Sequence, residues 1–179
     1  NATNLGSGTV PTARLGTGTA SSSTVLYGDQ TYKAEPGGGK VLQVVSSTFA
    51  VDTSTSGAPL TATGHIATLP SLASTSSKIL IFQSIANAYV TDSNYHMEIA
   101  YYSSINSGAY AQIGSTLFGF IRRYENATTG AGSNNYLYSP STTDSVSIQV
   151  YFNCTYTGTV NYSNGSTNTA NLTLMEIGA

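Results

Sequence analysis

The chain has unusually few charged residues. Asp, Glu, Lys and Arg make up 8% of its 179 residues, against about 25% in ordinary soluble domains. Six basic residues and a net charge of −2 argue against a nucleic-acid surface, because neutralising phosphates requires clustered cations. The one basic pair, Arg122-Arg123, would point to opposite faces of a strand and form no patch. We therefore expect no nucleic-acid partner.

Cysteine and long apolar runs are also scarce. Cys154 is the single cysteine, so an intramolecular disulfide is excluded. Its neighbours Tyr151, Phe152 and Tyr156 favour a strand, in which a lone cysteine is most often a small buried hydrophobe. No run of eighteen apolar residues occurs and the N-terminus has no signal-peptide core. The sequence thus predicts no membrane insertion.

Motifs of catalysis are missing as well: the chain has no HExxH, GxSxG or CxxC. His96 and Glu98 would share a strand face, but such a pair is most often solvated or paired across strands. A polysaccharide depolymerase needs two carboxylates about 5–9.5 Å apart across a groove, and the acids here are scattered. Asp92-x-Asn94 with Asn87 offers Ca²⁺ only two or three oxygens. We predict no enzyme activity, no cofactor and no metal.

What the chain does contain is enough apolar material for one core. Hydrophobic residues make up 40%, and the length suits one domain with an appendage. The surface must then consist mainly of Ser, Thr, Asn, Gln, Gly and Tyr. Six Asn-x-Ser/Thr sequons are an alternative sign of a glycosylated secreted protein, but Ser and Thr exceed a quarter of the chain, so chance supplies several. The sequons begin at Asn1, Asn126, Asn153, Asn161, Asn164 and Asn171.

The first forty residues contain a repeated phrase. Leu5-Gly-Ser-Gly-Thr-Val returns as Leu15-Gly-Thr-Gly-Thr-Ala. Ordering this backbone costs more free energy than its few apolar side chains return on burial. We therefore expect this arm to be either a flexible tether or a segment ordered by another chain, and the rest of the sequence favours the second.

Glu35-Pro-Gly-Gly-Gly39 divides the arm, residues 1–39, from a head domain, residues 40–179. Beyond it, apolar runs alternate with polar clusters and show no helical spacing. The segment Ile79-Leu80-Ile81-Phe82 is apolar on both faces, so both faces are expected to be covered. The sequence predicts an all-β sandwich or jelly roll, with a Gly-rich loop at 126–134. The expected strands are 40–49, 60–69, 78–90, 95–102, 112–124, 136–138, 144–153 and 170–177.

Residues 15–32 resemble the shaft-to-head junction of tailed-bacteriophage fibre proteins: a Gly/Thr/Ala/Ser phrase, a hydrophobic pair, then Gly-Asp and an aromatic. Residues 39–45, 69–81 and 172–177 are similar to strands of the jelly-roll heads of such fibres. Gln30 stands where Gly is common, which leaves Gly28 to supply the positive φ of the turn. The resemblance implies a homotrimer with a three-chain shaft and a TNF-like jelly-roll head. The implied trimer or shaft contacts are Leu5, Val10, Leu15, Val25, Leu26 and Tyr32.

Tyrosine is abundant, with thirteen residues and no Trp. Many lie near Ser, Asn and Gly, a combination that antibody paratopes also use and that suits sugar rings. Alternatively, these tyrosines cover apolar strands or pack at a subunit interface. The residues predicted to bind a receptor are Tyr110, Asn134, Tyr136, Tyr138, Tyr156 and Tyr162.

Taken together, the sequence predicts a non-enzymatic virion protein, the C-terminal part of a trimeric tail fibre. Its partners would be copies of itself, other virion proteins, and a host surface glycan or outer-membrane component. The alternative is a trimeric capsid decoration or head-fibre protein. Copy number per particle separates the two, since a fibre is present in a handful of copies and a decoration protein in scores.

Overall fold

The computed structural model describes residues 10–34, 39–57, 59–90, 96–122, 128–154, 159–162 and 169–178, without the side chains of residues 13, 90, 115–122 and 128–129. The chain divides into two compact units, residues 1–38 and 39–179. Within the described ranges, no helix is long and apolar enough to cross a membrane. The expectation that another chain orders the arm stays a prediction.

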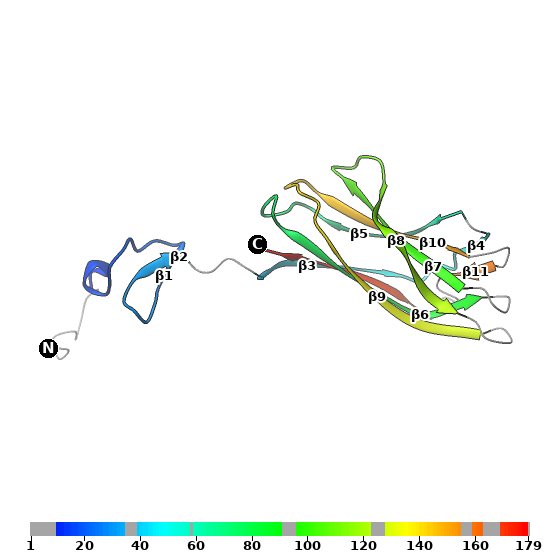
Figure 1. Cartoon of the computed structure of the whole chain (residues 1–179), viewed down its shortest axis with the longest axis horizontal. Helices are drawn as coiled ribbons and strands as arrows, with labels where there is room; N and C mark the ends of the chain where they lie inside the picture. Colours follow the sequence, from blue (N-terminus) through cyan, green and yellow to red (C-terminus); the bar gives the residue numbers. More distant parts are fainter. Residues whose placement is uncertain are drawn as a thin grey trace. The chain divides into compact units, whose positions relative to one another are not determined.

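The described part of the arm is a short helical turn followed by a hairpin (Figure 1). The 3-10 helix η2 is Thr12–Arg14, and β1, Thr24–Leu26, pairs with β2, Tyr32–Ala34. Thr17 lies beside the hairpin: its N–H donates to the Gln30 carbonyl at 2.8 Å, and its carbonyl accepts from the Tyr32 N–H at 2.7 Å. An extended arm was expected, but residues 10–34 do not form one extended strand, because local backbone pairing folds them back.

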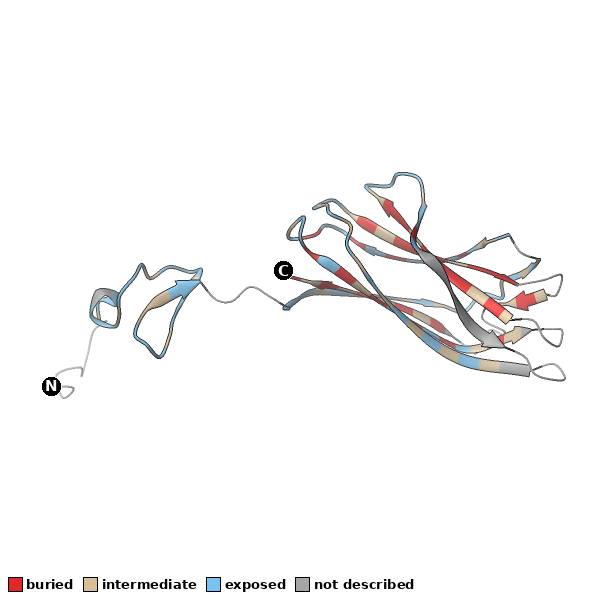
Figure 2. Ribbon diagram, viewed as in Figure 1, coloured by how far each residue is buried: buried red, intermediate tan, exposed pale blue. Residues whose placement is uncertain are grey.

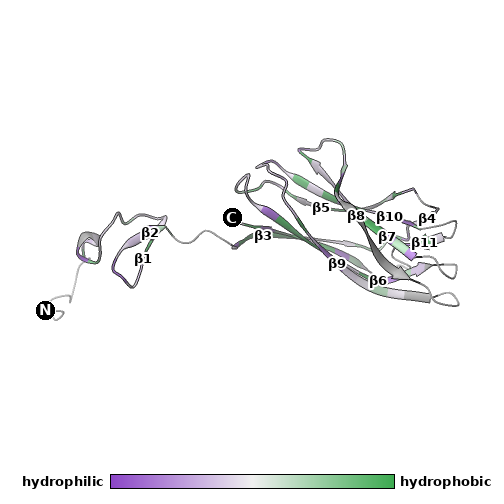
Figure 3. Cartoon of the chain, viewed as in Figure 1, coloured by the Kyte–Doolittle hydropathy of each residue, from purple (hydrophilic) through white to green (hydrophobic). Residues whose placement is uncertain are grey.

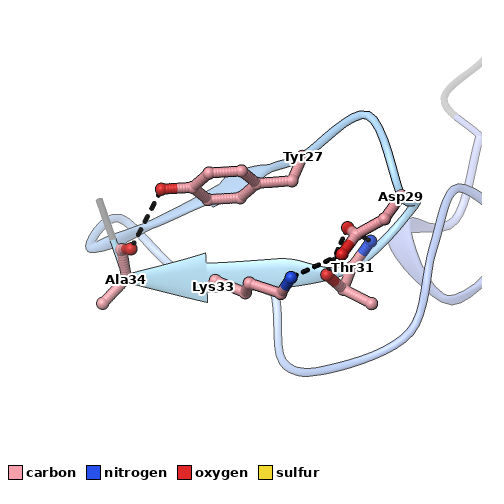
Figure 4. Close-up of polar contacts among 5 residues, drawn as sticks. All are labelled: Tyr27, Asp29, Thr31, Lys33 and Ala34. Carbon is pink, nitrogen blue, oxygen red and sulfur yellow. Dashed lines mark hydrogen bonds and ion pairs between the residues drawn. The ribbon is translucent and has the colours of Figure 1, made fainter. Parts of the chain in front are cut away.

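Asp29 closes the turn of this hairpin (Figure 4). Its carboxylate accepts hydrogen bonds from the Lys33 ammonium at 2.5 Å and from the N–H and hydroxyl of Thr31. Bonding to Lys33 first, and then to Thr31, lowers the pKa of Asp29 to about 2. Across the hairpin the Tyr27 hydroxyl donates to the Ala34 carbonyl at 3.4 Å.

Gln30 is the left-handed residue of this turn, with φ of 60°, so the expectation that Gly28 supplies the positive φ is wrong. The repeated phrase has a packing role in its second copy. A Cβ on Gly16 would lie 2.4 Å from the Gln30 carbonyl oxygen, and Gly18 has φ of 92°. Both glycines are required because the segment approaches the hairpin backbone closely.

The head is a β-sandwich of two antiparallel sheets (Figure 1). The four-stranded sheet has the order β5-β10-β7-β8. The six-stranded sheet has the order β3-β12-β6-β11-β4, with β9 also paired to β6. The chain passes repeatedly between the sheets, a jelly-roll-like connectivity. The strands are β3 Val41–Phe49, β4 Ser54–Ser56, β5 Thr61–Leu69, β6 Lys78–Val90, β7 His96–Ile105, β8 Ala111–Arg122, β9 Thr128–Tyr138, β10 Val146–Cys154, β11 Thr159–Asn161 and β12 Ala170–Ile177.

The all-β prediction is confirmed, and one predicted loop is wrong. Residues 128–134, expected in a Gly-rich loop, belong to β9, where Gly130 and Gly132 lie opposite Ala88 and Ile85 of β6. The long edge of β6 provides backbone partners, so pairing outweighs the low strand propensity of glycine. The short strands β4 and β11 were not expected.

The core lies between the sheets and follows the period-2 alternation of strands. Figure 2 shows buried residues alternating with less buried ones along β12, whose inward side chains include Leu172 and Leu174. Cys154 is fully buried, as the sequence predicted. Other large, fully buried side chains are Leu69, Ile79, Ile81, Ile85, Met97, Ile99, Ile148 and Phe152.

Candidate functional site

An apolar row crosses the outer face of the six-stranded sheet. Val44 of β3 pairs with Met175 of β12, Met175 with Leu80 of β6, and Leu80 with Leu137 of β9. Val44 is 52% exposed and Leu137 is 50% exposed, while Met175 and Leu80 are partly exposed. Because these four positions are neighbours across four strands, they form one continuous patch.

Further apolar side chains extend this patch. Phe82 follows Leu80 by two residues on β6 and is 41% exposed. At the start of β3, Val41 pairs with Ile177. Figures 2 and 3 together show that the first half of β3 is largely hydrophobic and yet largely uncovered. We call the set Val41, Val44, Leu80, Phe82, Leu137, Met175 and Ile177 the apolar face. Monomeric proteins rarely leave such contiguous patches open.

The sequence contains a signal for this face. Residues 79–82 are apolar on both sides of the strand, which predicted that both sides are covered. Ile79 and Ile81 are indeed fully buried in the core, but Phe82 and Leu80 face outward and stay accessible in the single chain. Among the residues that the structure describes, Leu80 and Phe82 therefore lack the second cover that the pattern predicted.

Away from this patch, the outer face of the same sheet becomes polar and hollow. A shallow depression there contains no titratable side chain. Its lining residues are Ser84, Ile85, Ala86, Ala131, Gly132, Ser133, Thr169 and Asn171. Hydroxyls and small side chains here offer no group for acid-base chemistry.

The outer face of the four-stranded sheet carries a group of tyrosines. Tyr102 of β7 and Tyr151 of β10 stack with ring centroids 3.8 Å apart and planes 25° apart. Tyr110, just before β8, is close enough to influence Tyr151: burial first, and then Tyr102 and Tyr110, raise the pKa of the Tyr151 hydroxyl. We call Tyr102, Tyr110 and Tyr151 the tyrosine cluster.

Amide side chains lie in the same cross-strand row as Tyr102. Gln149 of β10 and Gln112 of β8 are its neighbours on either side. The Tyr102 hydroxyl donates to Gln112 Oε1 at 3.5 Å. The cluster thus combines aromatic rings with groups that both donate and accept hydrogen bonds.

The structure separates the predicted receptor-binding residues. Tyr110 lies in the tyrosine cluster, whereas Tyr136 packs on Tyr101 with centroids 6.4 Å apart and the Tyr138 hydroxyl lies 3.0 Å from that of Ser103. Asn134, on the same strand, is half-buried opposite Gln83. Tyr156 lies outside the described residues.

Tyr162 is the predicted binding residue that the structure removes from any surface, because it is fully buried. The sequence analysis did not single out Tyr102 or Tyr151. The strict alternation of residues 144–153 contained the signal for Tyr151, since that pattern places Gln149 and Tyr151 on the outward face.

The predicted trimer or shaft contacts remain accessible in the single chain. Leu15, Val25 and Leu26 are each between 42% and 43% exposed, and Val10 and Tyr32 are partly exposed. Leu5 lies outside the described residues. The arm therefore leaves most of its described apolar side chains without burial.

Tyr162 belongs to a chain of hydrogen bonds through the core. The Ser47 carbonyl can only accept, so His65 Nε2, at 3.1 Å, carries the proton. His65 Nδ1 then accepts from the Tyr162 hydroxyl at 2.7 Å. That hydroxyl accepts from the Gln83 amide at 2.7 Å, and Gln83 Oε1 accepts from Tyr101 at 3.0 Å.

Every member of this chain is neutral. Burial lowers the pKa of His65, and burial raises the pKa of Tyr101 and of Tyr162 far above neutrality. The ring of Phe49 stacks on His65 with centroids 5.3 Å apart. A neutral network closed off from solvent holds strands of both sheets together and presents no nucleophile to a substrate.

Glu176, which is 1% exposed, is a buried polar side chain outside this network. Its carboxylate accepts from the Ala73 N–H and from the Gln43 amide, both at 2.7 Å. Burial raises its pKa, but hydrogen bonding from Ser77, Gln43 and Ala73 outweighs burial and leaves the pKa lowered. These bonds fasten the loop before β6 to the last strand.

Little else in the described ranges could perform chemistry. His96 Nε2 lies 3.3 Å from Glu98 Oε1 on the partly exposed outer face of β7. Among the described residues, no three His, Cys, Asp or Glu side chains come together as metal ligands. Asp92 and Asn94, which the sequence analysis judged too poor in oxygen ligands for Ca²⁺, lie outside the described residues.

No protein-family model and no curated protein matches the chain. Among solved structures, it is similar to the VP2 subviral particle of infectious bursal disease virus, with 6% identity and a TM-score of 0.42 over 77% of this chain and 40% of that chain. The structure of the Gx strain of the same virus gives 10% identity and a TM-score of 0.37 over 82% of this chain and 42% of that one. The chain thus spans about two fifths of these structures.

Proposed function

We propose that the chain is a non-enzymatic virion protein that associates with copies of itself through the apolar face, as the C-terminal part of a homotrimeric tail fibre that attaches to a host surface. The observation that carries the proposal is the row Val44, Met175, Leu80 and Leu137. Apolar area removed from water contributes about 25 cal/mol per Å². Obligate subunit interfaces are built from such core-like surfaces.

The point at which the arm is attached to the head favours a second copy as the partner. The arm joins the head at Gly39, whose N–H donates to the Gly178 carbonyl at 2.9 Å, while the Gly178 N–H donates to Lys40 at 2.8 Å. This junction lies at the end of β3 where the apolar face begins. Self-association there brings the starting points of the arms together, so that the exposed Leu15 and Val25 of each arm gain partners.

The phage origin and the number of copies come from the resemblance of residues 15–32 to fibre junctions. The low charge of the chain agrees with an attachment role in variable salt, because an uncharged interface is insensitive to ionic strength. Counting copies per particle distinguishes a tail fibre from a capsid decoration protein.

Light scattering of the full chain tests the self-association. We expect three times the single-chain mass of 18.5 kDa, at low and at high salt alike. Leu80→Glu and Leu137→Glu place a carboxylate in the apolar row and should give the single-chain mass with unchanged circular dichroism. Ser147→Glu, on the outer face of the other sheet, is the matched control and should remain trimeric. A wild-type monomer in dilute buffer, or a trimeric Leu80→Glu, contradicts the proposal.

A further inference from the structure

We propose that the tyrosine cluster is a binding site for a neutral saccharide, an inference that rests on the attachment function proposed above and assigns it to a sheet face. The stacked rings of Tyr102 and Tyr151 come from adjacent strands that pair without interruption from Val146 to Cys154. Rings held in this way lose little freedom when a ligand binds, which reduces the entropic cost of association.

The neighbours of the rings are suited to a ligand that is apolar on one side and hydroxylated at its edges. Ile66, Gln149, Tyr102 and Gln112 form one row across all four strands of the sheet. The C–H face of a pyranose ring packs on an aromatic ring, while amides and phenols bond its hydroxyls. Gln149 is only 8% exposed, so the exposed Gln112 supplies the accessible amide. Beside Tyr151, the paired residues Ala62 and Ala100 have small side chains, and Ala62 is exposed.

The charge of the surface selects the class of saccharide. In the row of Tyr102 and the row of Tyr151, no described side chain is charged. An acidic or phosphorylated polymer would find no cation among the described side chains of these two rows, and its charge would lose water without compensation. The raised pKa of Tyr151 keeps its hydroxyl a neutral donor at physiological pH. The site therefore fits neutral sugars.

The size of the surface argues against a protein partner. An aromatic side chain buries about 150–250 Å² when it is wholly covered, and these three rings are already half-buried. The cluster thus falls short of the about 800 Å² per partner of a stable protein interface. The apolar face comprises seven side chains and is the surface assigned to other copies of the chain.

Isothermal titration calorimetry of the full chain with maltohexaose, cellohexaose, mannohexaose and chitohexaose tests the site. We expect at least one of these probes to bind wild type, and Tyr102→Ala and Tyr151→Ala to weaken that binding on the order of tenfold, as for an aromatic hot-spot residue. Tyr151→Phe should keep most of the affinity. Tyr89→Ala, a partly exposed tyrosine on the other sheet, is the matched control and should bind as wild type does.

Light scattering on the same samples separates this inference from the proposed function. If no probe binds wild type, or if Tyr102→Ala binds as wild type does, the saccharide site is overturned while a trimeric mass leaves the self-association standing. If Tyr102→Ala and Tyr151→Ala lower the mass, the cluster is an interface between copies, and the saccharide assignment is again overturned. Normal affinity in a monomeric wild type would instead overturn the self-association alone.

Discussion

The outer faces of the two sheets are built on the same backbone geometry and differ in side-chain chemistry. On the six-stranded sheet, the outward positions include Val44, Leu80 and Leu137, which offer no hydrogen bonds. On the four-stranded sheet, the outward positions include Tyr102 and Tyr151, which combine a ring with a hydroxyl. A purely apolar face suits permanent burial, whereas an amphipathic face tolerates both water and a ligand.

This difference shows how one sandwich can keep assembly and recognition apart. The core between the sheets serves both faces equally, so either face can vary without disturbing the fold. Assembly through one face leaves the opposite face open. The proposed trimer and the proposed saccharide site therefore do not compete for the same residues.

The largest expected effect distinguishes the inner from the outer side of one strand. Leu174 is fully buried, so Leu174→Ala should reduce the free energy of unfolding by about 2–5 kcal/mol at any protein concentration. Met175, its neighbour, faces outward in the apolar row. Met175→Ala should cost stability only where chains are associated, so its effect on urea unfolding should depend on protein concentration.

Equal losses for Leu174→Ala and Met175→Ala at every concentration would break the comparison, because both residues would then belong to the core of a single chain. A loss of stability that Met175→Ala shows only at high protein concentration would sharpen the comparison. The slope of unfolding with urea should be unchanged in dilute solution, since neither change alters the area that a single chain exposes on unfolding.

An intermediate effect on stability is expected from a change in pH. It arises from residues of the core and not from either outer face. Burial lowers the folded pKa of His65 below its ordinary value of 6.5, so the unfolded chain binds more protons in this range. Stability is then full above pH 6.5 and falls as the pH drops below it. Glu176, with a lowered pKa, contributes stability that is lost only below its ordinary value of 4.5. Thermal unfolding between pH 7.5 and 3 should show the two losses in separate windows, on the order of pH 6.5 and 4.5.

His65→Gln should remove the loss between about pH 6.5 and 5, and His96→Gln, at the partly exposed pair with Glu98, should leave it in place. A thermal midpoint that does not change between pH 7 and about 5 would contradict the assignment of a neutral, buried His65. The tyrosine cluster contains no histidine, so ligand binding there should not follow this transition.

The smallest effect is expected in the arm. Gln30 has φ of 60°, a conformation that costs an L-residue about 1–2 kcal/mol. Gln30→Gly should relieve this cost, less the extra freedom of glycine in the unfolded arm, and so stabilise the hairpin by about 0.5–1 kcal/mol. Slower amide exchange at Thr17, Tyr27 and Tyr32, whose N–H groups are bonded across the turn, would show it. Faster exchange would mean that the Gln30 side chain stabilises the turn.

The regular alternation of the longer strands was predictable from the sequence. Residues 144–153 and 170–177 alternate apolar and other residues, and the structure contains β10 and β12 at these positions. The fold class and the burial of Cys154 follow from the same local pattern. β9 was not predictable in full, because Gly130 and Gly132 carry no strand signal and are paired only through β6.

The two candidate surfaces could not be predicted from the local sequence, because each depends on the register between strands that are distant in the sequence. Tyr102 and Tyr151 lie far apart in the sequence, and they stack only because β7 and β10 pair with Gln149 opposite Tyr102. Turn-like neighbours made Tyr162 resemble a surface residue, yet the short strand β11 places it in the core between His65 and Gln83. Local composition cannot distinguish these cases, since each depends on which strand lies alongside.

By itself, the sequence determined that the chain is all β, poor in charge and apolar on both sides of residues 79–82, because composition and period-2 alternation are local properties. Only the tertiary structure decided which outward residues become neighbours. Strand register joined Val44 to Leu137 across four strands and set Tyr102 against Tyr151 on the opposite sheet. The physical reason is that a surface is formed by pairing between distant segments, and a displacement of one residue would send each of these side chains to the other face.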